Sequence, residues 1–556
     1  MKTIIVGGVA GGASAAARLR RLNENDEIII LERGDYISFA NCGLPYFIGG
    51  EITDKNMLTL QTPESFRKRF NIDVRVKSEA VKISPEANTV TVRNADTGEE
   101  YEETFDKLIL SPGAEPIRPN IGGIELPHVF TLRNISDTMR IKGFIDGRKP
   151  RKAVVVGGGY IGVEMAENLI KADLEVSIVE LADHLIAPLD ADMAADVHRY
   201  IRSKGIKLFL NNGVTEITDK KVILQNGSIE ADMVIMSVGV RPETSLAKEC
   251  GIALNSRGSI IVNSHMETNY PDIYAVGDAV EVKDFVTGSA AFIPLAGPAN
   301  KQGRIAADNI SGIASEYKGT QGSAVLKLFD MTVATTGLNE KRAAAEGIDY
   351  DKTYTYSASH ASYYPNATNM SVKVLWDKNT KKLIGAQIVG FDGVDKRMDV
   401  LATAIRFGAE VTDLKDLELC YAPPFGSAKD PVNMAGFVAE NVINGTVRQF
   451  FWHDVEKLPR DGSVTLLDVR TKTEIARGMI AGFINIPLDD LRDNLDKLTK
   501  DKPVYVHCHS GLRSYIACRI LSGNGYECYN LAGGWRMYES VINDRTVQEY
   551  ICNECR

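Results

Sequence analysis

Two stretches of the chain follow the same order of apolar strand, glycine-rich turn, helix and second strand. The first runs from TIIVGGVAGG at residue 3 through ASAAARLRRL to EIIILE. The second begins with AVVVGGGYIGVEMAENL at residue 153 and ends with LEVSIVE. Continuous apolar runs are typical of strands buried on both faces, and the segments after the turns have helical periodicity. Each stretch therefore predicts a β-α-β unit of a doubly wound α/β sheet.

The second turn carries the full dinucleotide fingerprint G-x-G-x-x-G, at Gly157, Gly159 and Gly162. Such a turn lets a pyrophosphate approach the free N–H groups of the following helix. Glu180, at the end of the next strand, can accept hydrogen bonds from ribose hydroxyls. Because this acid would repel a 2′-phosphate, we expect NADH here, although the pattern leaves NADPH open.

The first turn departs from the fingerprint, because its middle position is Val9. It still has an acid at the end of the following strand, so a dinucleotide site is expected; a tight turn without a ligand is the alternative. Later, NYPDIYAVGDAVE ends an apolar run on Gly277 and Asp278. A carboxylate at that place can hold sugar-like hydroxyls.

Composition excludes several classes of protein. A length of 556 residues predicts about three or four domains. The formal charge of −9 argues against nucleic-acid binding, and no apolar stretch is long enough to span a membrane. Eight cysteines are too few for a disulfide scaffold, so we expect a cytoplasmic protein with free thiols; its first residues form a strand, which indicates no signal peptide. Cys552 and Cys555 form an isolated Cys-x-x-Cys, so no metal site is predicted, and their role stays open.

Cys42 stands alone in SFANCGLPYFIGG, just beyond the first β-α-β unit. Loops at that edge of a doubly wound sheet reach bound ligands. A helix starting near Cys42, with Pro45 in its first turn, is expected to lower the pKa of the thiol. Since no second cysteine is adjacent, its redox partner would be an external sulfur or oxygen; a buried structural cysteine is the alternative.

These motifs resemble those of the flavoprotein disulfide reductases, and SFANCGLPY with GGVAGGASAAARLRRL resembles their coenzyme A-disulfide reductase branch. The resemblance implies NADH on the second fingerprint. Single-cysteine NADH oxidases and peroxidases share the cysteine loop but carry a His where this chain has Ala10, so peroxide or oxygen reduction is disfavoured. The resemblance places FAD on Gly7, Gly8, Ala10, Gly11, Gly12, Glu32, Arg33, Gly277 and Asp278.

The same branch uses tyrosines that reach the active site across a homodimer interface. The matching residues are Tyr363 and Tyr421, although Tyr364 could replace Tyr363, and interface packing alone is the alternative. A phenol can donate a proton to a departing thiolate. Contacts to CoA are implied for Ser14, Arg18, Arg21, Ser38, Asn41, Asn300 and Lys429. A solvated helix face is the alternative for the two arginines.

The last part of the chain forms a further predicted unit. PVYVHC is a buried strand that ends on Cys508, and a loop leads through Arg513 into the helix RSYIACRIL. Successive loop N–H groups would form an anion nest for a thiolate or persulfide. From LLDVR to LAGGW this unit resembles a rhodanese domain, a sulfurtransferase. Tyrosine phosphatases have five residues between their Cys and Arg, whereas this chain has four, which disfavours phosphatase chemistry.

The predicted map has four parts. An FAD-binding domain (1–119 and 246–323) receives an inserted NAD-binding domain (120–245); an α+β dimerisation domain (324–445) and an α/β rhodanese domain (450–556) follow. The hypothesis is an NADH- and FAD-dependent reductase of CoA persulfide, polysulfide or CoA disulfide that acts through Cys42, with Cys508 carrying sulfane sulfur and sulfide as product. A plain CoA-disulfide reductase with an independent sulfurtransferase, a thiosulfate sulfurtransferase and a redox sensor signalling through Cys42 are the alternatives.

Overall fold

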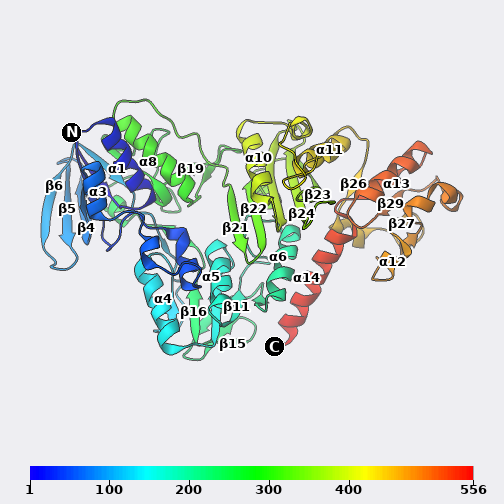
Figure 1. Ribbon diagram of the computed structural model, residues 1–556, viewed down its shortest axis with the longest axis horizontal. Helices are drawn as coiled ribbons and strands as arrows, with labels where there is room; N and C mark the ends of the chain where they lie inside the picture. The colour runs from blue at the N-terminus through cyan, green and yellow to red at the C-terminus, as the bar shows by residue number, and fades with distance from the viewer. Residues whose placement is uncertain (555–556) are drawn as a thin grey trace. The chain divides into compact units, whose positions relative to one another are not determined.

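The computed structural model describes residues 1–554, and side chains as far as residue 549 (Figure 1). The side chains of Cys552 and Cys555 therefore lie outside the described residues. The chain is of mixed α/β type, as expected, and divides into two compact units. The first unit comprises Met1–Leu181, Gly205–Leu208 and Asn212–Gly322, and the second comprises Ala182–Lys204, Phe209–Asn211 and Ser323–Arg556.

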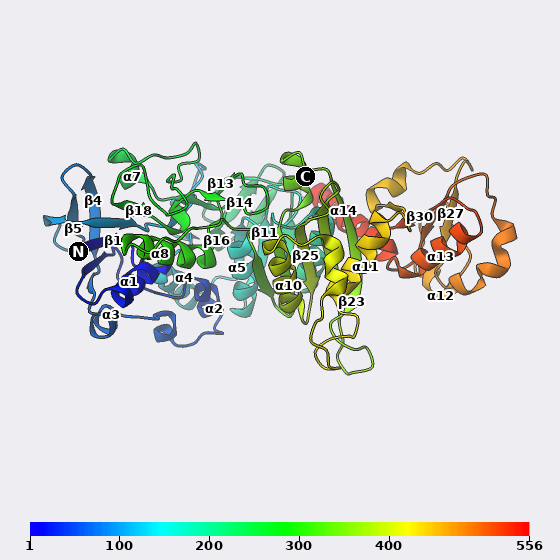
Figure 2. The same cartoon turned by 90° about the horizontal axis from the view of Figure 1, so that it is seen from above.

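The first sheet of the first unit is parallel, in the order β18-β7-β1-β2-β3. Side chains on one face of its central strand, such as Ile5, pack against α1 and α8, whereas Ile4 packs in a core on the opposite face. Helices α1 and α8 lie side by side (Figure 2). The elements are β1 (Lys2–Val6), α1 (Ala10–Leu22), β2 (Glu27–Leu31), β3 (Asp73–Arg75), β7 (Lys107–Leu110), β18 (Ile273–Ala275) and α8 (Ala296–Ile310).

A second parallel sheet of the same type has the order β12-β11-β10-β16-β9. Its elements are β9 (Val129–Phe130), α4 (Ile135–Arg148), β10 (Lys152–Val156), α5 (Tyr160–Lys171), β11 (Glu175–Val179), α6 (Ala191–Ser203), β12 (Lys207–Phe209) and β16 (Met233–Met236). The chain passes from the first parallel sheet to the second through β8 (Ala114–Pro116) and returns through β17 (Val240–Pro242). These two strands pair with each other. Both β-α-β units predicted from the sequence are present.

Shorter elements complete the first unit. Antiparallel sheets are formed by β4 (Ser78–Ser84), β5 (Thr89–Asn94) and β6 (Glu100–Thr104), by β13 (Val214–Ile217), β14 (Lys221–Leu224) and β15 (Ser228–Glu230), and by β19 (Val282–Lys283) with β20 (Ala290–Ala291). The remaining helices are α2 (Leu44–Ile48), α3 (Pro63–Phe70) and α7 (Ser245–Glu249).

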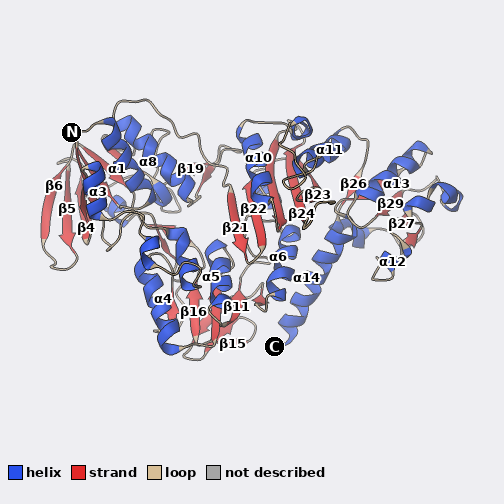
Figure 3. Ribbon diagram, in the orientation of Figure 1, coloured by secondary structure: helices blue, strands red, loops and turns tan. Residues whose placement is uncertain are grey.

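The second unit contains an antiparallel sheet in the order β21-β22-β25-β24-β23, against which α10 and α11 pack (Figure 3). Strand β25 is buried along its whole length, and Trp376 near the end of β24 is only 1% exposed. Its elements are β21 (Ala324–Leu328), β22 (Met331–Gly337), α9 (Glu340–Ala345), β23 (Tyr350–Ala358), β24 (Asn369–Asp377), β25 (Leu383–Gly390), α10 (Val394–Arg406) and α11 (Pro431–Ile443).

The C-terminal part has a parallel sheet in the order β26-β30-β29-β27-β28. Its elements are β26 (Gln449–Phe450), β27 (Thr465–Asp468), α12 (Lys472–Ile475), β28 (Ile484–Asn485), β29 (Val504–His507), α13 (Leu512–Gly523), β30 (Cys528–Leu531) and α14 (Gly534–Glu554).

Within the second unit, α14 of this C-terminal part packs along α6 (Figure 1). His198 Nδ1 on α6 lies 2.9 Å from Asp544 Oδ2 on α14, and Arg202 Nη1 donates to the other oxygen of Asp544 at 2.6 Å. These long-range contacts tie residues 182–204 to the C-terminal part.

Candidate active site

The first glycine turn is held by backbone contacts that exclude side chains. Gly7 has φ +98°, and a Cβ atom there would lie 2.1 Å from Ser111 O, at the end of the neighbouring strand. A Cβ on Gly12 would lie 1.9 Å from Gly7 O. Glu32 accepts hydrogen bonds from the N–H groups of Gly8 at 3.0 Å and of Gly34 at 2.8 Å, which fixes the acid beside the turn. The turn, the helix N-terminus and the acid thus meet at one edge of the sheet.

The second turn repeats this geometry. Gly157 has φ +104°, and a Cβ atom on Gly162 would lie 2.0 Å from Gly157 O. The Gly158 N–H donates to Glu180 at 2.6 Å. Gly159 differs, because a Cβ there would meet no atom within 4 Å. Its side-chain position faces open space, which suits the approach of a pyrophosphate to the N-terminus of α5.

Asp278 lies three residues beyond the end of β18, at the same sheet edge as the first turn. Burial raises the pKa of its carboxyl, and Arg133 opposes this shift. The carboxylate makes no hydrogen bond within the described part of the chain, so its oxygens are available to hydroxyl groups of a ligand. Arg33, in contrast, donates to both carboxylate oxygens of Glu243. Asp278 and the first glycine turn therefore suit the hydroxyl and phosphate groups of a flavin cofactor.

Cys42 lies in a short 3-10 turn, Asn41–Gly43, which leads directly into α2. Helix α2 packs on α5, the helix that follows the second glycine turn. Glu164 of α5 accepts a hydrogen bond from Tyr46 of α2 at 3.4 Å. Glu164 and Asp278 are both close enough to act electrostatically on the Cys42 thiol. Cys42 therefore lies within reach of residues attached to both glycine-turn sheets.

The predicted lowering of the Cys42 pKa is wrong for this structure. A helix begins at the expected place with Pro45 in its first turn, but α2 has only five residues and begins after the cysteine. Solvent reaches the thiol, yet protein atoms surround it on several sides; this burial raises its pKa, and the carboxylates of Glu164 and Asp278 raise it further. Burial and two nearby acids therefore set the direction of the shift.

Glu164 has no sequence motif and was not anticipated. Burial raises its pKa to about 7, and the nearby Glu167 adds to the shift. The same carboxyl therefore changes its charge near neutral pH beside the Cys42 thiol. Only the packing of α2 on α5 reveals its position, because 122 positions separate Glu164 from Cys42 in the chain.

The residues expected to contact CoA are partly brought together. Ser14 Oγ donates to Asn300 Oδ1 at 2.5 Å, and Ser38 donates its N–H to Gly8 O at 2.8 Å, beside the first turn. Arg18 Nε forms an ion pair with Asp308 at 2.7 Å, so its charge is already compensated. Arg21, Asn41 and Lys429 are exposed, and Lys429 belongs to the second unit.

Tyr363 and Tyr421 meet in the second unit. Their hydroxyl oxygens lie 2.9 Å apart, although 58 positions separate the residues. Tyr363 is 75% exposed, and its hydrogen bond with Tyr421 raises its pKa. The neighbouring Tyr364 instead packs its ring edge against His360, with centroids 5.7 Å apart. The geometry favours Tyr363 over Tyr364 as the partner of Tyr421.

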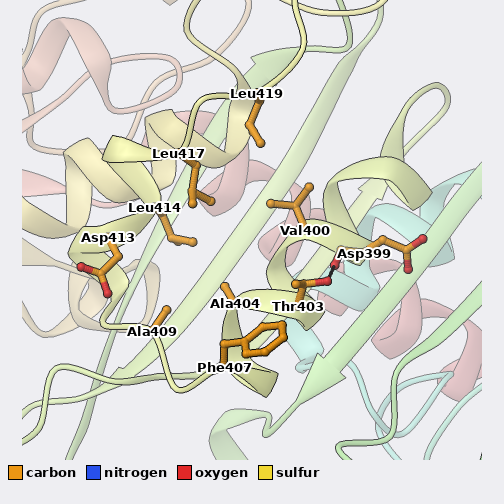
Figure 4. A pocket seen from close by; sticks show the side chains of 10 residues that line it. All are labelled: Asp399, Val400, Thr403, Ala404, Phe407, Ala409, Asp413, Leu414, Leu417 and Leu419. Carbon is orange, nitrogen blue, oxygen red and sulfur yellow. Dashed lines mark hydrogen bonds between the residues drawn. The ribbon is translucent and has the colours of Figure 1, made fainter.

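An apolar groove of about 430 Å³ lies between the end of α10 and the segment that follows it (Figure 4). None of the expected site residues lines it. Phe407, at one wall, is 84% exposed. The lining residues are Asp399, Val400, Thr403, Ala404, Phe407, Ala409, Asp413, Leu414, Leu417 and Leu419. Exposed aromatic and aliphatic side chains in a concave surface are typical of an interface between proteins.

Cys508 follows β29 and is fully buried. Its sulfur accepts the Gly511 N–H at 3.1 Å and the Ser514 hydroxyl at 3.3 Å. The expected series of loop N–H groups is thus replaced by one N–H and one hydroxyl. Arg513 donates to both oxygens of Glu474, at 2.8 and 2.6 Å. This ion pair holds the pKa of Glu474 at about 2.

A buried ion cluster lies elsewhere in the second unit. Lys373 is completely buried, and its Nζ lies 2.8 Å from Asp190, 2.9 Å from Asp192 and 2.5 Å from Glu340. The three acids are grouped closely enough to resemble a metal site. The Lys373 ammonium, however, takes the position that a metal cation would need. Lys352 adds a second ammonium, 2.5 Å from Glu340.

Three family models match consecutive parts of the chain. Residues 1–303 match pyridine nucleotide-disulphide oxidoreductases, residues 323–431 match the dimerisation domain of the same proteins, and residues 452–540 match rhodanese-like domains. The first match covers more than half of the chain. The chain belongs to this oxidoreductase family. It is accordingly a flavoprotein enzyme, and FAD and NAD(H) are the cofactors of the family.

Individual relatives agree with this assignment. Coenzyme A disulfide reductase of Staphylococcus haemolyticus is 37% identical over 443 residues, which cover 79% of this chain and 100% of that protein. The reduced CoADR-RHD protein of Bacillus anthracis is 52% identical, with a TM-score of 0.96 and 98% of both chains covered. An NAD-dependent persulfide reductase from A. fulgidus is 35% identical, with a TM-score of 0.91; 97% of this chain and 100% of that one are covered.

The family assignment supports NADH- and FAD-linked reduction of a disulfide or persulfide, combined with a rhodanese-like domain. Within the described residues, no helix combines the length and apolar character needed to cross a bilayer. The expected limits of the four domains, and the roles of individual site residues, remain predictions.

Proposed function

We propose that this enzyme uses NADH to reduce the sulfur–sulfur bond of CoA persulfide, polysulfide or CoA disulfide, with Cys42 as its redox thiol. The position of Cys42 carries the proposal, because Glu164 of the second nucleotide region and Asp278 of the first both act on it. Among the described cysteines, the other one in the first unit is Cys250. Its sulfur donates to Ala247 O at the end of α7 and packs against a core of the first sheet. The disulfide partner of Cys42 is therefore the substrate.

The chemistry of Cys42 follows from this. With CoA persulfide, the thiolate attacks the sulfur attached to CoA and expels hydrosulfide, which leaves a Cys42–CoA disulfide. Two electrons from NADH then cleave that bond, and thiolates of Cys42 and CoA are regenerated. FAD supplies the two-electron connection between nicotinamide and disulfide. It would be held by Gly7, Gly8, Ala10, Gly11, Gly12, Glu32, Gly277 and Asp278.

Tyr363 and Tyr421 are proposed to protonate the departing CoA thiolate from the partner subunit of a homodimer. Their paired, exposed hydroxyls and the raised pKa of Tyr363 support this role, because a phenol must hold its proton until the thiolate leaves. The dimerisation domain and the apolar groove beside Phe407 support a homodimer. CoA would be bound by Ser14, Arg18, Arg21, Ser38, Asn41, Asn300 and Lys429.

Cys508 is proposed to carry sulfane sulfur as a persulfide and to deliver it to CoA or to Cys42, in a cytoplasmic enzyme. The buried sulfur with two hydrogen-bond donors supports this role. A second candidate function is a plain CoA-disulfide reductase with an independent sulfurtransferase domain. It is favoured by the staphylococcal relatives, whose whole length aligns with only 79% of this chain.

Steady-state NADH oxidation and hydrosulfide release test both candidates, with CoA disulfide, CoA persulfide and polysulfide as acceptors. Cys42→Ser should abolish NADH oxidation with every acceptor, whereas the matched variant Cys250→Ser should retain it. Hydrosulfide release from polysulfide that survives Cys42→Ser would exclude the main proposal. Cys508→Ser separates the candidates: cooperation predicts lower hydrosulfide release from polysulfide, and independence predicts no change in any NADH-linked rate.

A further inference from the structure

A second pair of thiols lies in the core of the rhodanese-like part. Cys518 is on α13 and Cys528 begins β30, and the two residues are 1% and 8% exposed. The two side chains are near enough to shift each other's pKa, in opposite directions. The Cys528 sulfur also lies 3.3 Å from Cys518 O and 3.3 Å from Ser522 Oγ. Because the Cys528 sulfur touches the backbone of Cys518 itself, the two side chains are placed to meet, as a disulfide requires.

The pair is connected to Cys508 along one face of α13. Ser514, Cys518 and Ser522 are spaced by four residues, so they lie one above another on the helix. The first contacts the Cys508 sulfur and the last contacts the Cys528 sulfur. All three cysteines share one buried apolar cluster. Sulfur chemistry at Cys508 therefore takes place beside a dithiol that the proposed reaction does not use.

We propose that Cys518 and Cys528 form a reversible dithiol that polysulfide oxidises to an intradomain disulfide. Polysulfide is a small, unbranched oxidant, which suits a sulfur that is only 8% exposed. Cys528 is the attacking group, because it is the more exposed of the two. The interaction with the Cys518 side chain also lowers the pKa of Cys528, while that of Cys518 is raised well above its usual value.

The oxidation balances with inorganic tetrasulfide. The Cys528 thiolate attacks a terminal sulfur of S₄²⁻ and expels S₃²⁻, which takes up a proton to become HS₃⁻, so that Cys528 carries one added sulfur. The Cys518 thiolate then attacks Cys528 Sγ, expels that sulfur as hydrosulfide and closes the disulfide. Two thiols lose two protons and two electrons, and S₄²⁻ becomes HS⁻ and HS₃⁻. A dithiol reductant reverses the change.

Trypsin separates the three cysteines of this region. Cleavage after Lys500, Arg513, Arg519 and Arg536 gives peptides 501–513, 514–519 and 520–536, which contain Cys508, Cys518 and Cys528 respectively. The full-length flavoenzyme would be treated with inorganic tetrasulfide without NADH, quenched with acid, alkylated after denaturation and digested. We expect peptides 514–519 and 520–536 to appear joined, two hydrogens lighter than their sum, and to separate after dithiothreitol.

The proposal is overturned if Cys518 and Cys528 remain fully alkylated while peptide 501–513 has gained sulfur. It is also overturned if Cys508 is linked to either of them instead. The joined species should be lost in Cys528→Ser and kept in Cys250→Ser, and the measurement on the unmodified enzyme stands even if the first variant folds poorly. Because no NADH is added, the outcome is independent of whether Cys42 performs the proposed reduction.

Discussion

Replacing Lys373 with Met should destabilise the second unit strongly at neutral pH. Lys373 is fully buried, and its ammonium contacts Asp190, Asp192 and Glu340. Methionine has a similar volume, so packing changes little while the charge disappears. Three buried carboxylates would then face Lys352 alone. Removing one partner of a buried ion pair typically costs about 3–5 kcal/mol, because the charge that remains is not compensated.

The loss should shrink as the pH falls. Burial opposes the ionisation of Asp192, but Lys373 and Lys352 outweigh it and hold its pKa at about 2. A carboxyl whose folded pKa lies below its unfolded value stabilises the protein above the unfolded pKa, near 4. Without Lys373, burial dominates, the folded pKa lies above the unfolded value, and stability is lost as the pH rises. The two proteins should therefore differ most at pH 8 and less at pH 5.

Tryptophan emission can follow this unit alone, because all three tryptophans, Trp376, Trp452 and Trp535, lie in it. Urea titrations at pH 8 and pH 5 would give the change in unfolding free energy. Lys378→Met is the matched control: this lysine is half exposed and pairs with Asp349, so its loss should cost less than about 1 kcal/mol. A Lys373→Met loss below about 1 kcal/mol, or one that is equal at both pH values, would refute the reasoning.

Two further predictions concern the nucleotide sites and the redox thiol. Gly159→Ala should raise the KM for NADH several-fold without lowering the melting temperature, because its Cβ enters open space; Gly162→Ala should instead destabilise the fold, since its Cβ meets Gly157 O at 2.0 Å. NADH titration with thermal melting of both variants checks this, and equal melting losses would contradict it. Glu164→Gln should lower the pKa of Cys42 by removing a nearby negative charge, so iodoacetamide should alkylate the reduced enzyme faster at pH 8. An unchanged rate–pH profile would show that this carboxyl does not act on the thiol.

The sequence was informative where local pattern determines structure. Gly157 and Gly162 could be assigned because a strand, a turn and a helix follow one another within a few residues, and backbone contacts leave no room for a side chain. The acids Glu32 and Glu180 could be placed for the same reason. The pairing of Tyr363 with Tyr421 depended on a family resemblance, since no spacing rule joins residues 58 positions apart.

Contacts between distant segments could not be predicted. The pKa of Cys42 was expected to fall because its own loop suggested a helix dipole, whereas the structure brings Glu164 and Asp278 toward it from other elements. Lys373 lies within a strand pattern that gives no sign of a charged cluster, and its partners come from two other segments. Electrostatic surroundings of this kind depend on tertiary packing and have no local signature.

The packing of α14 on α6 has a consequence for how the second unit is assembled during synthesis. His198 and Asp544 are 346 positions apart, so their contact has a very high sequence separation. Helix α6 leaves the ribosome with the second nucleotide sheet, and it can pack on β25 and contact Lys373 as soon as those residues follow. His198 and Arg202 of α6, however, lack their partner Asp544 until α14 has been translated. The nucleotide sheets can therefore form during translation, whereas the second unit becomes cooperative only afterwards. In a chain stalled on the ribosome before residue 534, protease should cut α6 near His198 and Arg202 more readily than in the complete protein.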